Sequence, residues 1–308
     1  MGSVIVTLFE GDYVLGVGAL ANSLYRHGFR GRVYCGHKGP LLFWAKDALQ
    51  EGAFRVLRPA EGLELRFFPI EHPWHLTNLK PHMMLKVWDE WEPDAEAMFY
   101  FDPDITIKCR WSFFEEWVGY GVALCEEIVM ANMPEDHPLR CAWLHWAERL
   151  GWPKARDCRG VLNGGFVGLR RYQRDFLEMW REGMDSLGAE LPLHGFTPGE
   201  RTQPFNMTDQ DMLNVLLSVY PGPISRVGPE GMDFVPGGVV MSHAAGSVKP
   251  WRKRYLRSAL GGVAPTQADK NWLVNTEGPI PVLEPRRRKA LTREIRFAAA
   301  LGRILHRR

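Results

Sequence analysis

The sequence is poor in cysteine, and its five cysteines are not grouped. Their number is odd, and no two of them stand in a Cys-x-x-Cys spacing. This distribution argues against a cysteine-based zinc site and against a disulfide framework, and it favours free thiols in a reducing cytoplasm. The cysteines are Cys35, Cys109, Cys125, Cys141 and Cys158.

Long apolar runs are also missing. No stretch of about 18 apolar residues occurs, so we expect no segment that spans a bilayer. The N-terminus has no basic stretch followed by a long apolar one, which argues against a signal peptide. No internal repeat is visible. We therefore expect a cytoplasmic globular protein.

Net charge is small but unevenly distributed. The formal net charge of +2 argues against a general nucleic-acid binder. The segment 285–308 nevertheless holds nine lysines and arginines and one acid, Glu294, a net +8 that leaves −6 for the remainder. An acidic body therefore carries a basic tail.

Short apolar runs alternate with helical patterns along the chain. That order predicts an α/β fold with a parallel sheet covered by helices, and the length allows one large domain or two small ones. A segment rich in Gly, Pro and Asn, 261–285, is the expected linker. We expect strands near 4–8, 33–35, 65–70, 97–101, 161–169 and 239–241, and helices over 11–27, 81–91 and 208–220, the last with Thr208 or Asp209 as N-cap.

The most informative segment is Ala97–Ile107, where an apolar run leads directly into Asp102 and Asp104. Such a run predicts a buried strand, and ligands of α/β sheets bind at strand ends. Alternate residues of an extended chain point the same way, so the two carboxylates would repel each other without a cation. Oxygen ligands suit Mg²⁺, Mn²⁺ or Ca²⁺. A plain turn after the strand is the open alternative, since Asp-Pro favours turns.

Four other segments could belong to the same site, and the first of them runs from His243 to Trp251. His243 follows an expected strand and could complete a metal set, while Lys249 is a compact cation suited to phosphate. Gly246 between them would let a ligand approach the backbone. Each of these residues could equally be an ordinary surface residue.

The remaining segments are polar groups at the ends of elements. Asn163 and Gly164 lie where two glycines interrupt a strand, which indicates a bulge or a close backbone approach. Asp209 and Gln210 lie at a helix start, where helix capping is the alternative. A strand-end hydroxyl and the next aromatic, Thr7 and Tyr13, could hold a base or simply belong to the core.

In this order, the segments resemble the retaining glycosyltransferases of the glycogenin and lipopolysaccharide galactosyltransferase type, family 8. The resemblance covers roughly residues 4–251, and its most specific part is the string His-x-x-Gly-x-x-Lys-Pro-Trp from His243 to Trp251. It implies a GT-A fold with a mixed, mostly parallel sheet flanked by helices. It further implies transfer of a hexose from a UDP-sugar to a hydroxyl acceptor that the sequence does not identify.

The resemblance also implies the roles of individual residues. Asp102, Asp104 and His243 would hold Mn²⁺, with Mg²⁺ as the alternative. Lys249 and the backbone near Gly246 would bind the diphosphate. Lys86 would lie beside the donor sugar and next to Asp102, which also counts as donor-binding. Thr7 and Tyr13 would surround the uracil, and Asn163, Gly164, Asp209 and Gln210 would contact the transferred sugar. The implied catalytic residues are Asp209, Gln210 and Lys249.

The chain divides on this interpretation into three parts. Residues 1–107 would form the nucleotide-sugar-binding half of one GT-A domain, 108–260 its acceptor-binding half, and 261–308 a linker and a basic amphipathic tail. Apolar residues at helical spacing within 286–308 favour either contact with an anionic membrane, which would place the protein at the inner face of a membrane, or packing on the body. These residues are Leu291, Ile295, Ala298, Leu301 and Leu305.

Two other functions fit part of the sequence. Asp102 and Asp104 also match the Asp-x-Asp-x-Thr motif of haloacid dehalogenase-type phosphatases, in which Asp102 would be the nucleophile. That motif normally opens the chain, and the Lys-Pro-Trp segment would then lack a role. A non-catalytic module that binds sugar nucleotides is the third interpretation.

Overall fold

The computed structural model describes residues 2–129, 132–194 and 203–305 of the chain. A mixed sheet forms its centre, with a small two-stranded ribbon beside it. The strands are β1 (Ser3–Glu10), β2 (Gly31–Lys38), β3 (Leu49–Glu51), β4 (Phe54–Ala60), β5 (Leu63–Pro69), β6 (Ala97–Phe101), β7 (Ile105–Ile107), β8 (Val122–Glu126), β9 (Leu162–Arg170), β10 (Ile224–Val227) and β11 (Met241–His243).

The order of strands in the main sheet is β10-β8-β9-β6-β1-β2-β5-β4-β3. The middle strands β6, β1, β2 and β5 run parallel to one another, and antiparallel pairs adjoin them on both sides. The ribbon consists of β7 and β11, which run antiparallel. This is the mixed α/β architecture expected for a GT-A fold.

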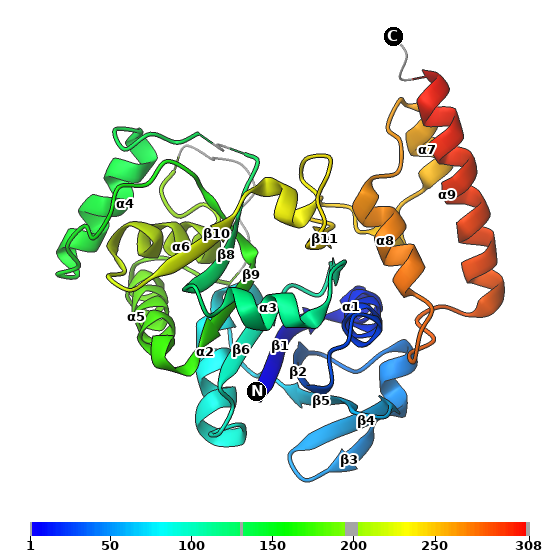
Figure 1. Cartoon of the computed structure of the whole chain (residues 1–308), viewed down its shortest axis with the longest axis horizontal. Coiled ribbons are helices and arrows are strands. Elements are labelled where there is room, and N and C mark those ends of the chain that lie inside the picture. The colour runs from blue at the N-terminus through cyan, green and yellow to red at the C-terminus, as the bar shows by residue number, and fades with distance from the viewer. Residues whose placement is uncertain (1, 130–131, 195–202, 306–308) are drawn as a thin grey trace.

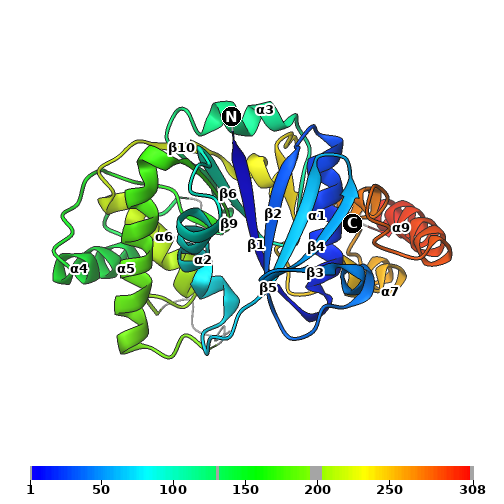
Figure 2. The same ribbon diagram turned by 90° about the horizontal axis from the view of Figure 1, so that it is seen from below.

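Helices cover both faces of the sheet (Figures 1 and 2). Residues of α1, α3, α7, α8 and α9 join one apolar core, and residues of α2, α4, α5 and α6 join the other. The helices are α1 (Val14–Arg26), α2 (Lys80–Lys86), α3 (Trp111–Trp117), α4 (Pro138–Arg149), α5 (Arg174–Glu190), α6 (Thr208–Val219), α7 (Tyr255–Leu260), α8 (Gln267–Asn275) and α9 (Pro285–Leu305).

The central strands are buried over most of their length because helices cover both of their faces. Along β1, Ile5 and Phe9 contribute to one core, while Val4, Val6 and Leu8 contribute to the other. This is the period-two alternation of a strand. Strand β6 is buried along its whole length, as expected for a parallel strand between two layers of helices.

Close packing against α1 fixes the turn that follows β6. A Cβ atom on Gly16 would lie 2.1 Å from the carbonyl oxygen of Pro103 and 2.9 Å from the ring of Trp251. No side chain fits there, so the glycine allows the Asp102–Asp104 turn to lie directly on the helix.

The structure confirms the expected strands and helices around these central elements, but it also differs from the expectation in other places. The last strand, expected at 239–241, is β11 and begins two residues later. The N-cap of α6 is Met207, not Thr208 or Asp209, and its backbone N–H donates to the Asp211 carboxylate at 2.7 Å. Several elements were not anticipated: strands β3, β4, β7, β8 and β10, and helices α3, α4, α5 and α7.

The C-terminal region is more ordered than a linker and a tail. The segment 261–285 contains α8, whose Trp272 and Leu273 are buried in the core shared with α1. Helix α9 also packs on the body, since Ile295 and Ala298 are 3% and 0% exposed. Packing therefore accounts for most of the predicted apolar stripe. Among the described residues, no helix is long and apolar enough to cross a membrane, and the five cysteines form no disulfide.

Candidate active site

The ribbon of β7 and β11 brings together residues that are far apart in the sequence. Asp102 and Asp104 lie in the turn between β6 and β7, and the register of the ribbon pairs His243 with Ile105. The turn is held at both ends: the Asp102 amide donates to the Gly165 carbonyl at 2.7 Å, and the Ala244 amide donates to the Asp104 carbonyl at 3.1 Å. The site therefore depends on backbone pairing across the ribbon and with β9.

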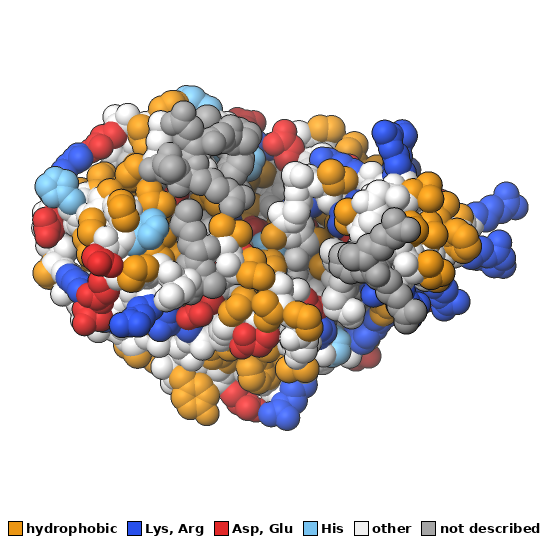
Figure 3. Space-filling model, turned by 90° about the horizontal axis from the view of Figure 1, so that it is seen from above, with side chains coloured by type: hydrophobic (Ala, Val, Ile, Leu, Met, Phe, Trp, Pro, Cys, Tyr) orange, Lys and Arg blue, Asp and Glu red, His pale blue; other side chains and the backbone are white. Residues whose placement is uncertain are grey.

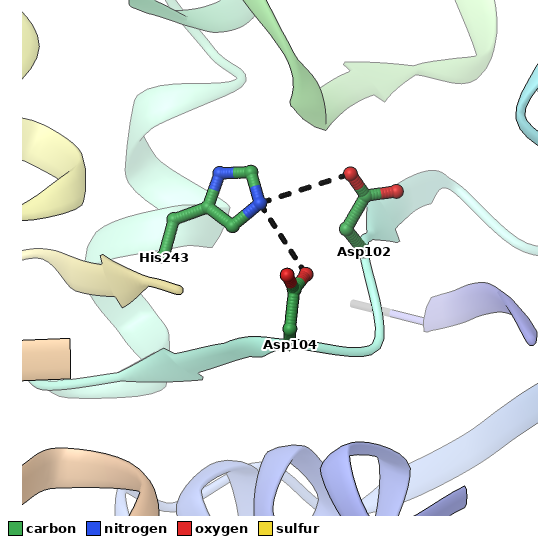
Figure 4. Close-up of side chains that lie close together, drawn as sticks. All are labelled: Asp102, Asp104 and His243. Atoms are coloured by element: carbon green, nitrogen blue, oxygen red, sulfur yellow. Dashed lines mark ion pairs between the residues drawn. The ribbon is translucent and has the colours of Figure 1, made fainter. Parts of the chain in front are cut away.

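Three potential ligand atoms converge at this point. The His243 Nε2 atom lies 3.3 Å from Oδ1 of Asp104 and 3.9 Å from Oδ2 of Asp102, as Figure 4 shows. One ligand atom from each of the three residues lies within 4.8 Å of the others. The predicted metal set is thus assembled in the structure.

The other oxygen of each carboxylate is neutralised by a lysine. Oδ1 of Asp102 accepts a hydrogen bond from the Tyr100 hydroxyl at 2.8 Å and lies 3.3 Å from the ammonium of Lys80. Oδ2 of Asp104 accepts from Lys249 at 2.6 Å, and Lys249 also donates to the Ala244 carbonyl at 3.0 Å. Each aspartate therefore has one oxygen held by the protein and one facing the imidazole.

Charge balance keeps Asp104 ionised despite its burial. Burial alone would raise the pKa of its carboxyl group, but His243 and Lys249 outweigh that effect and hold the pKa well below its usual range. The pKa of Tyr100 is raised well above its usual value, mainly by burial. Tyr100 therefore stays protonated and remains a donor to Asp102.

The donor set fits a divalent cation. Two carboxylate oxygens and one imidazole nitrogen suit Mn²⁺ well, and Mg²⁺ less well because of the nitrogen. The imidazole ring lies directly against Gly165, where a Cβ would lie 2.6 Å from Cε1 of His243. Nε2 is the nitrogen that faces the carboxylates, while Nδ1 is buried and has no hydrogen-bond partner among the described residues.

Lys80 links the candidate metal site to the residues expected at the sugar. Its ammonium donates to Asp209 and to the Gly164 carbonyl, both at 2.7 Å, in addition to its contact with Asp102. Burial would lower the pKa of Lys80, but Asp102 and Asp209 raise it overall. A charged lysine, only 1% exposed, therefore bridges the two carboxylates.

Lys86, expected beside Asp102, lies elsewhere. It is exposed at the end of α2, 3.1 Å from Glu90, and its ammonium lies over the ring of Trp91 at 5.4 Å. None of its contacts is with Asp102 or Asp209. The ammonium group next to the first carboxylate belongs instead to Lys80, at the start of the same helix.

Polar groups from β9 and α6 continue the site beyond Asp209. The Gln210 side-chain oxygen accepts from the Gly164 amide at 3.1 Å and lies 3.4 Å from the Asn163 side-chain nitrogen. Asn163 also donates to Glu127 at 2.6 Å. The structure thus brings Asn163, Gly164, Asp209 and Gln210 together, as the family resemblance implies, and adds the buried Glu127 to them.

The residues expected at the nucleotide are less closely grouped. Tyr13 packs edge-on against Trp251 with ring centroids 5.4 Å apart, and its ring centroid lies 5.7 Å from the Lys249 ammonium. Gly246 is exposed, and a Cβ there would meet no atom within 4 Å, which leaves room for a ligand. Thr7 is fully buried, and its hydroxyl has no hydrogen-bond partner among the described residues.

Three functional groups were not found from the sequence. Lys80 and Tyr100 stand beside or in predicted elements, whereas Glu127 lies where no element was predicted, and nothing in their spacing distinguishes them. The one available signal was Lys80-Pro81, a charged residue next to a proline at a helix start. A pattern of this kind does not reveal that the side chain is buried.

Comparisons with solved structures identify the fold. The WbbM bifunctional glycosyltransferase, in its apo structure, matches with a TM-score of 0.58 and 14% identity over 95% of this chain. The galactosyltransferase LgtC, solved with donor and acceptor sugar analogues, matches with a TM-score of 0.53 and 15% identity over 93% of this chain. No protein-family model matches the sequence, and a search of curated proteins finds no match.

The two matches differ in how much of each neighbour is covered. This chain spans 52% of WbbM but 99% of LgtC. At these identities the likeness shows a shared fold, and both neighbours are glycosyltransferases. The GT-A fold implied by the family resemblance is therefore confirmed.

Proposed function

We propose that the chain is a metal-dependent retaining glycosyltransferase of the family 8 type, which moves a hexose from a UDP-sugar to a hydroxyl acceptor. One observation carries the proposal: Asp102, Asp104 and His243 converge beside two buried lysines at the end of a central strand. The shared fold with two glycosyltransferases supports it. The division into a donor half, 1–107, an acceptor half, 108–260, and a tail from 261 stays a prediction.

The bound Mn²⁺ would supply positive charge to the diphosphate as it leaves. Three atoms would hold the ion: Oδ2 of Asp102, Oδ1 of Asp104 and Nε2 of His243. Lys249 lies against Asp104 on the same side, where its ammonium can donate to the diphosphate oxygens. Because negative charge grows on those oxygens during bond cleavage, a fixed cation stabilises the transition state more than the ground state.

On the sugar side, the chain offers hydrogen bonds instead of a nucleophile. Asp209 and Asn163 can bind sugar hydroxyls, and Gln210 would lie near the reacting carbon. An amide is a poor nucleophile, so retention by front-face attack fits this site better than a covalent intermediate. Lys80 takes over the role expected of Lys86, because it holds Asp102 and Asp209 in place together.

The acceptor and the location of the protein are proposed only as classes. Any hydroxyl of a glycan, lipid or small molecule suits the chemistry, and the acceptor analogue in the LgtC structure is a sugar. We place the protein in the cytoplasm and, through 286–308, at the inner face of a membrane. The non-catalytic module remains the alternative, whereas the phosphatase is not favoured because the structural neighbours are glycosyltransferases.

The proposal can be tested by thermal denaturation with UDP-sugars in the presence and absence of Mn²⁺. We expect stabilisation by the nucleotide-sugar only with the cation, and loss of that stabilisation in Asp104→Asn. The phosphatase inhibitor beryllium fluoride should not change the melting temperature. Cation-independent binding, or Mn²⁺-dependent UDP binding unchanged in Asp104→Asn, would contradict the metal role. Slow hydrolysis of the donor in the absence of acceptor would exclude the non-catalytic module.

A further inference from the structure

Each carboxylate of the candidate metal site has one oxygen that the protein already holds. Oδ1 of Asp102 accepts a hydrogen bond from the Tyr100 hydroxyl at 2.8 Å, and Oδ2 of Asp104 accepts one from Lys249 at 2.6 Å. Only the second oxygen of each group faces His243. While these hydrogen bonds last, each aspartate can offer a cation one oxygen and not two.

Tyr100 is the most firmly placed of the donors that hold these oxygens. It lies in β6, where it pairs with Val6 of β1 and Val167 of β9, and it is 1% exposed. Because alternate residues of an extended chain point to the same side, its hydroxyl reaches the carboxylate two residues further on. Among the described residues, that hydroxyl has no other hydrogen-bond partner.

The two lysines are less committed to these oxygens. Lys80 lies 3.3 Å from Oδ1 of Asp102 but is closer, at 2.7 Å, to Asp209. Lys249 is the residue that would donate to the diphosphate under the proposed function, so its present hydrogen bond would not be permanent. Tyr100 is therefore the donor that keeps one oxygen of Asp102 away from the ion throughout.

The distribution of charge over the molecule does not distinguish one divalent cation from another. Figure 3 shows lysine and arginine side chains projecting at the end that holds α7–α9, with acidic side chains mostly elsewhere. Such a field acts alike on Mg²⁺, Mn²⁺ and Ca²⁺, because it depends on the charge of the ion and on distance. Selection between these ions must come from the ligand atoms that touch them.

We propose that Tyr100 makes the site select Mn²⁺ over Ca²⁺. By binding Oδ1 of Asp102, it limits that carboxylate to one oxygen, which suits a small ion with about six ligands in a regular arrangement. Ca²⁺ takes about six to eight oxygen ligands and commonly uses both oxygens of a carboxylate, so it loses more than Mn²⁺ does. The imidazole of His243 acts in the same direction, since nitrogen suits Mn²⁺ better than Ca²⁺. This role of Tyr100 rests on the proposed function, in which Asp102 binds the ion.

The test is competition between the two ions, measured without a sugar donor. Mn²⁺ is titrated into the full chain, free Mn²⁺ is followed by electron paramagnetic resonance, and Ca²⁺ is then added as the competitor. In Tyr100→Phe we expect the affinity for Ca²⁺ relative to Mn²⁺ to rise about tenfold, the effect of losing a hydrogen bond to a charged group. The variant keeps the aromatic ring, whose centroid lies 5.0 Å from the Lys80 ammonium.

Tyr34→Phe is the matched control. Tyr34 is a fully buried residue of β2, and its hydroxyl donates to the Glu92 carboxylate at the same distance, 2.8 Å. Glu92 is not one of the candidate ligands. Loss of this hydrogen bond should therefore leave the ratio of the two affinities unchanged.

An unchanged ratio in Tyr100→Phe would overturn the proposal, and so would equal weakening of both ions, which a merely structural role predicts, or the same rise in Tyr34→Phe. A crystal structure of the wild type with Mn²⁺ gives a measurement that does not depend on the variant. It should show one oxygen of Asp102 on the ion and the Tyr100 hydrogen bond intact, whereas both oxygens on the ion would exclude the role of Tyr100. If the wild type bound no Mn²⁺, the proposed function would fail as well, so the two failures are distinct.

Discussion

The charges of the site explain why single residues matter there. Asp102, Asp104 and Asp209 contribute three carboxylates, and Lys80 and Lys249 neutralise only two of them. A divalent cation would make the cluster positive and ready for a diphosphate. Removing either lysine would instead leave carboxylates facing each other with too little positive charge, which is costly in a buried site.

At this scale, Lys80 and Lys86 form a matched pair. Lys80→Met should lower donor turnover by about one to two orders of magnitude, because charged hydrogen bonds of roughly 1.5–3 kcal/mol are lost. Lys86→Met removes the same group from the surface and should leave turnover nearly unchanged. Kinetics of donor hydrolysis measure both, and Lys80→Arg checks that the fold survives. If donor turnover fell in Lys86→Met but not in Lys80→Met, Lys86 would be the lysine that acts at the donor sugar, as first expected.

Asp211 gives the protein a pH dependence of known sign. Burial is the main cause that raises the pKa of its carboxyl group from 3.8 to about 7. Between these two pH values the folded state holds a proton that the unfolded chain has released. This group's contribution to stability is therefore fully present below pH 3.8 and is lost progressively as the pH rises towards 7.

The variant Asp211→Asn tests this sign. The amide oxygen can still accept the hydrogen bond from the Met207 backbone but carries no charge. Its melting temperature, measured by calorimetry, should be close to that of the wild type near pH 4, and its advantage over the wild type should grow up to about pH 7. A parallel pH dependence in both proteins would show that Asp211 does not titrate in this range.

At the scale of elements, the sequence predicts which strands are buried better than it predicts which residues of neighbouring elements contact each other. The apolar runs of β1 and β6 identify buried strands, and Asp102 and Asp104 at the end of β6 identify the candidate metal site. Periodicity does not say which helix residue meets that site: Lys80 and Lys86 lie in the same helix, and only the packing of α2 on β6 distinguishes them. Strand β3 escaped notice because it is short and exposed throughout, and β4 because charged residues interrupt its apolar ones.

The close packing of α1 predicts an effect of Gly16 on metal binding. Gly16→Ala gains about 1 kcal/mol of helix propensity, but its Cβ would overlap the Pro103 carbonyl, and overpacking of this kind costs about 1–3 kcal/mol. We therefore expect lower stability and weaker Mn²⁺ affinity, measured by calorimetric titration. Gly261→Ala, where the nearest atom is 3.4 Å away, is the control. Mn²⁺ affinity equal to that of the wild type would mean that α1 does not position the turn.

At the scale of the whole molecule, the β7–β11 ribbon joins two distant parts of the chain. Residues 102–107 belong to the first half of the sequence and 241–249 to the last third, yet each supplies ligands to one cluster. This pairing could be inferred from the sequence only through the family resemblance, because no local pattern relates His243 to Asp104. The candidate metal site therefore joins the turn after β6 to strand β11.

That arrangement predicts coupled protection on binding. Addition of Mn²⁺ and UDP should slow amide hydrogen exchange in 102–107 and 241–249 together, because the ion would bind both strands of the ribbon and stabilise the state in which they are paired. Helix α4, far from the ribbon, should not change. The variant His243→Ala lacks the imidazole that β11 would supply to the ion. The protection that Mn²⁺ and UDP give should therefore be smaller in both segments than in the wild type. Protection restricted to 102–107 in the wild type would show that His243 does not bind the ion. The pairing of β7 with β11 would then serve the fold and not metal binding.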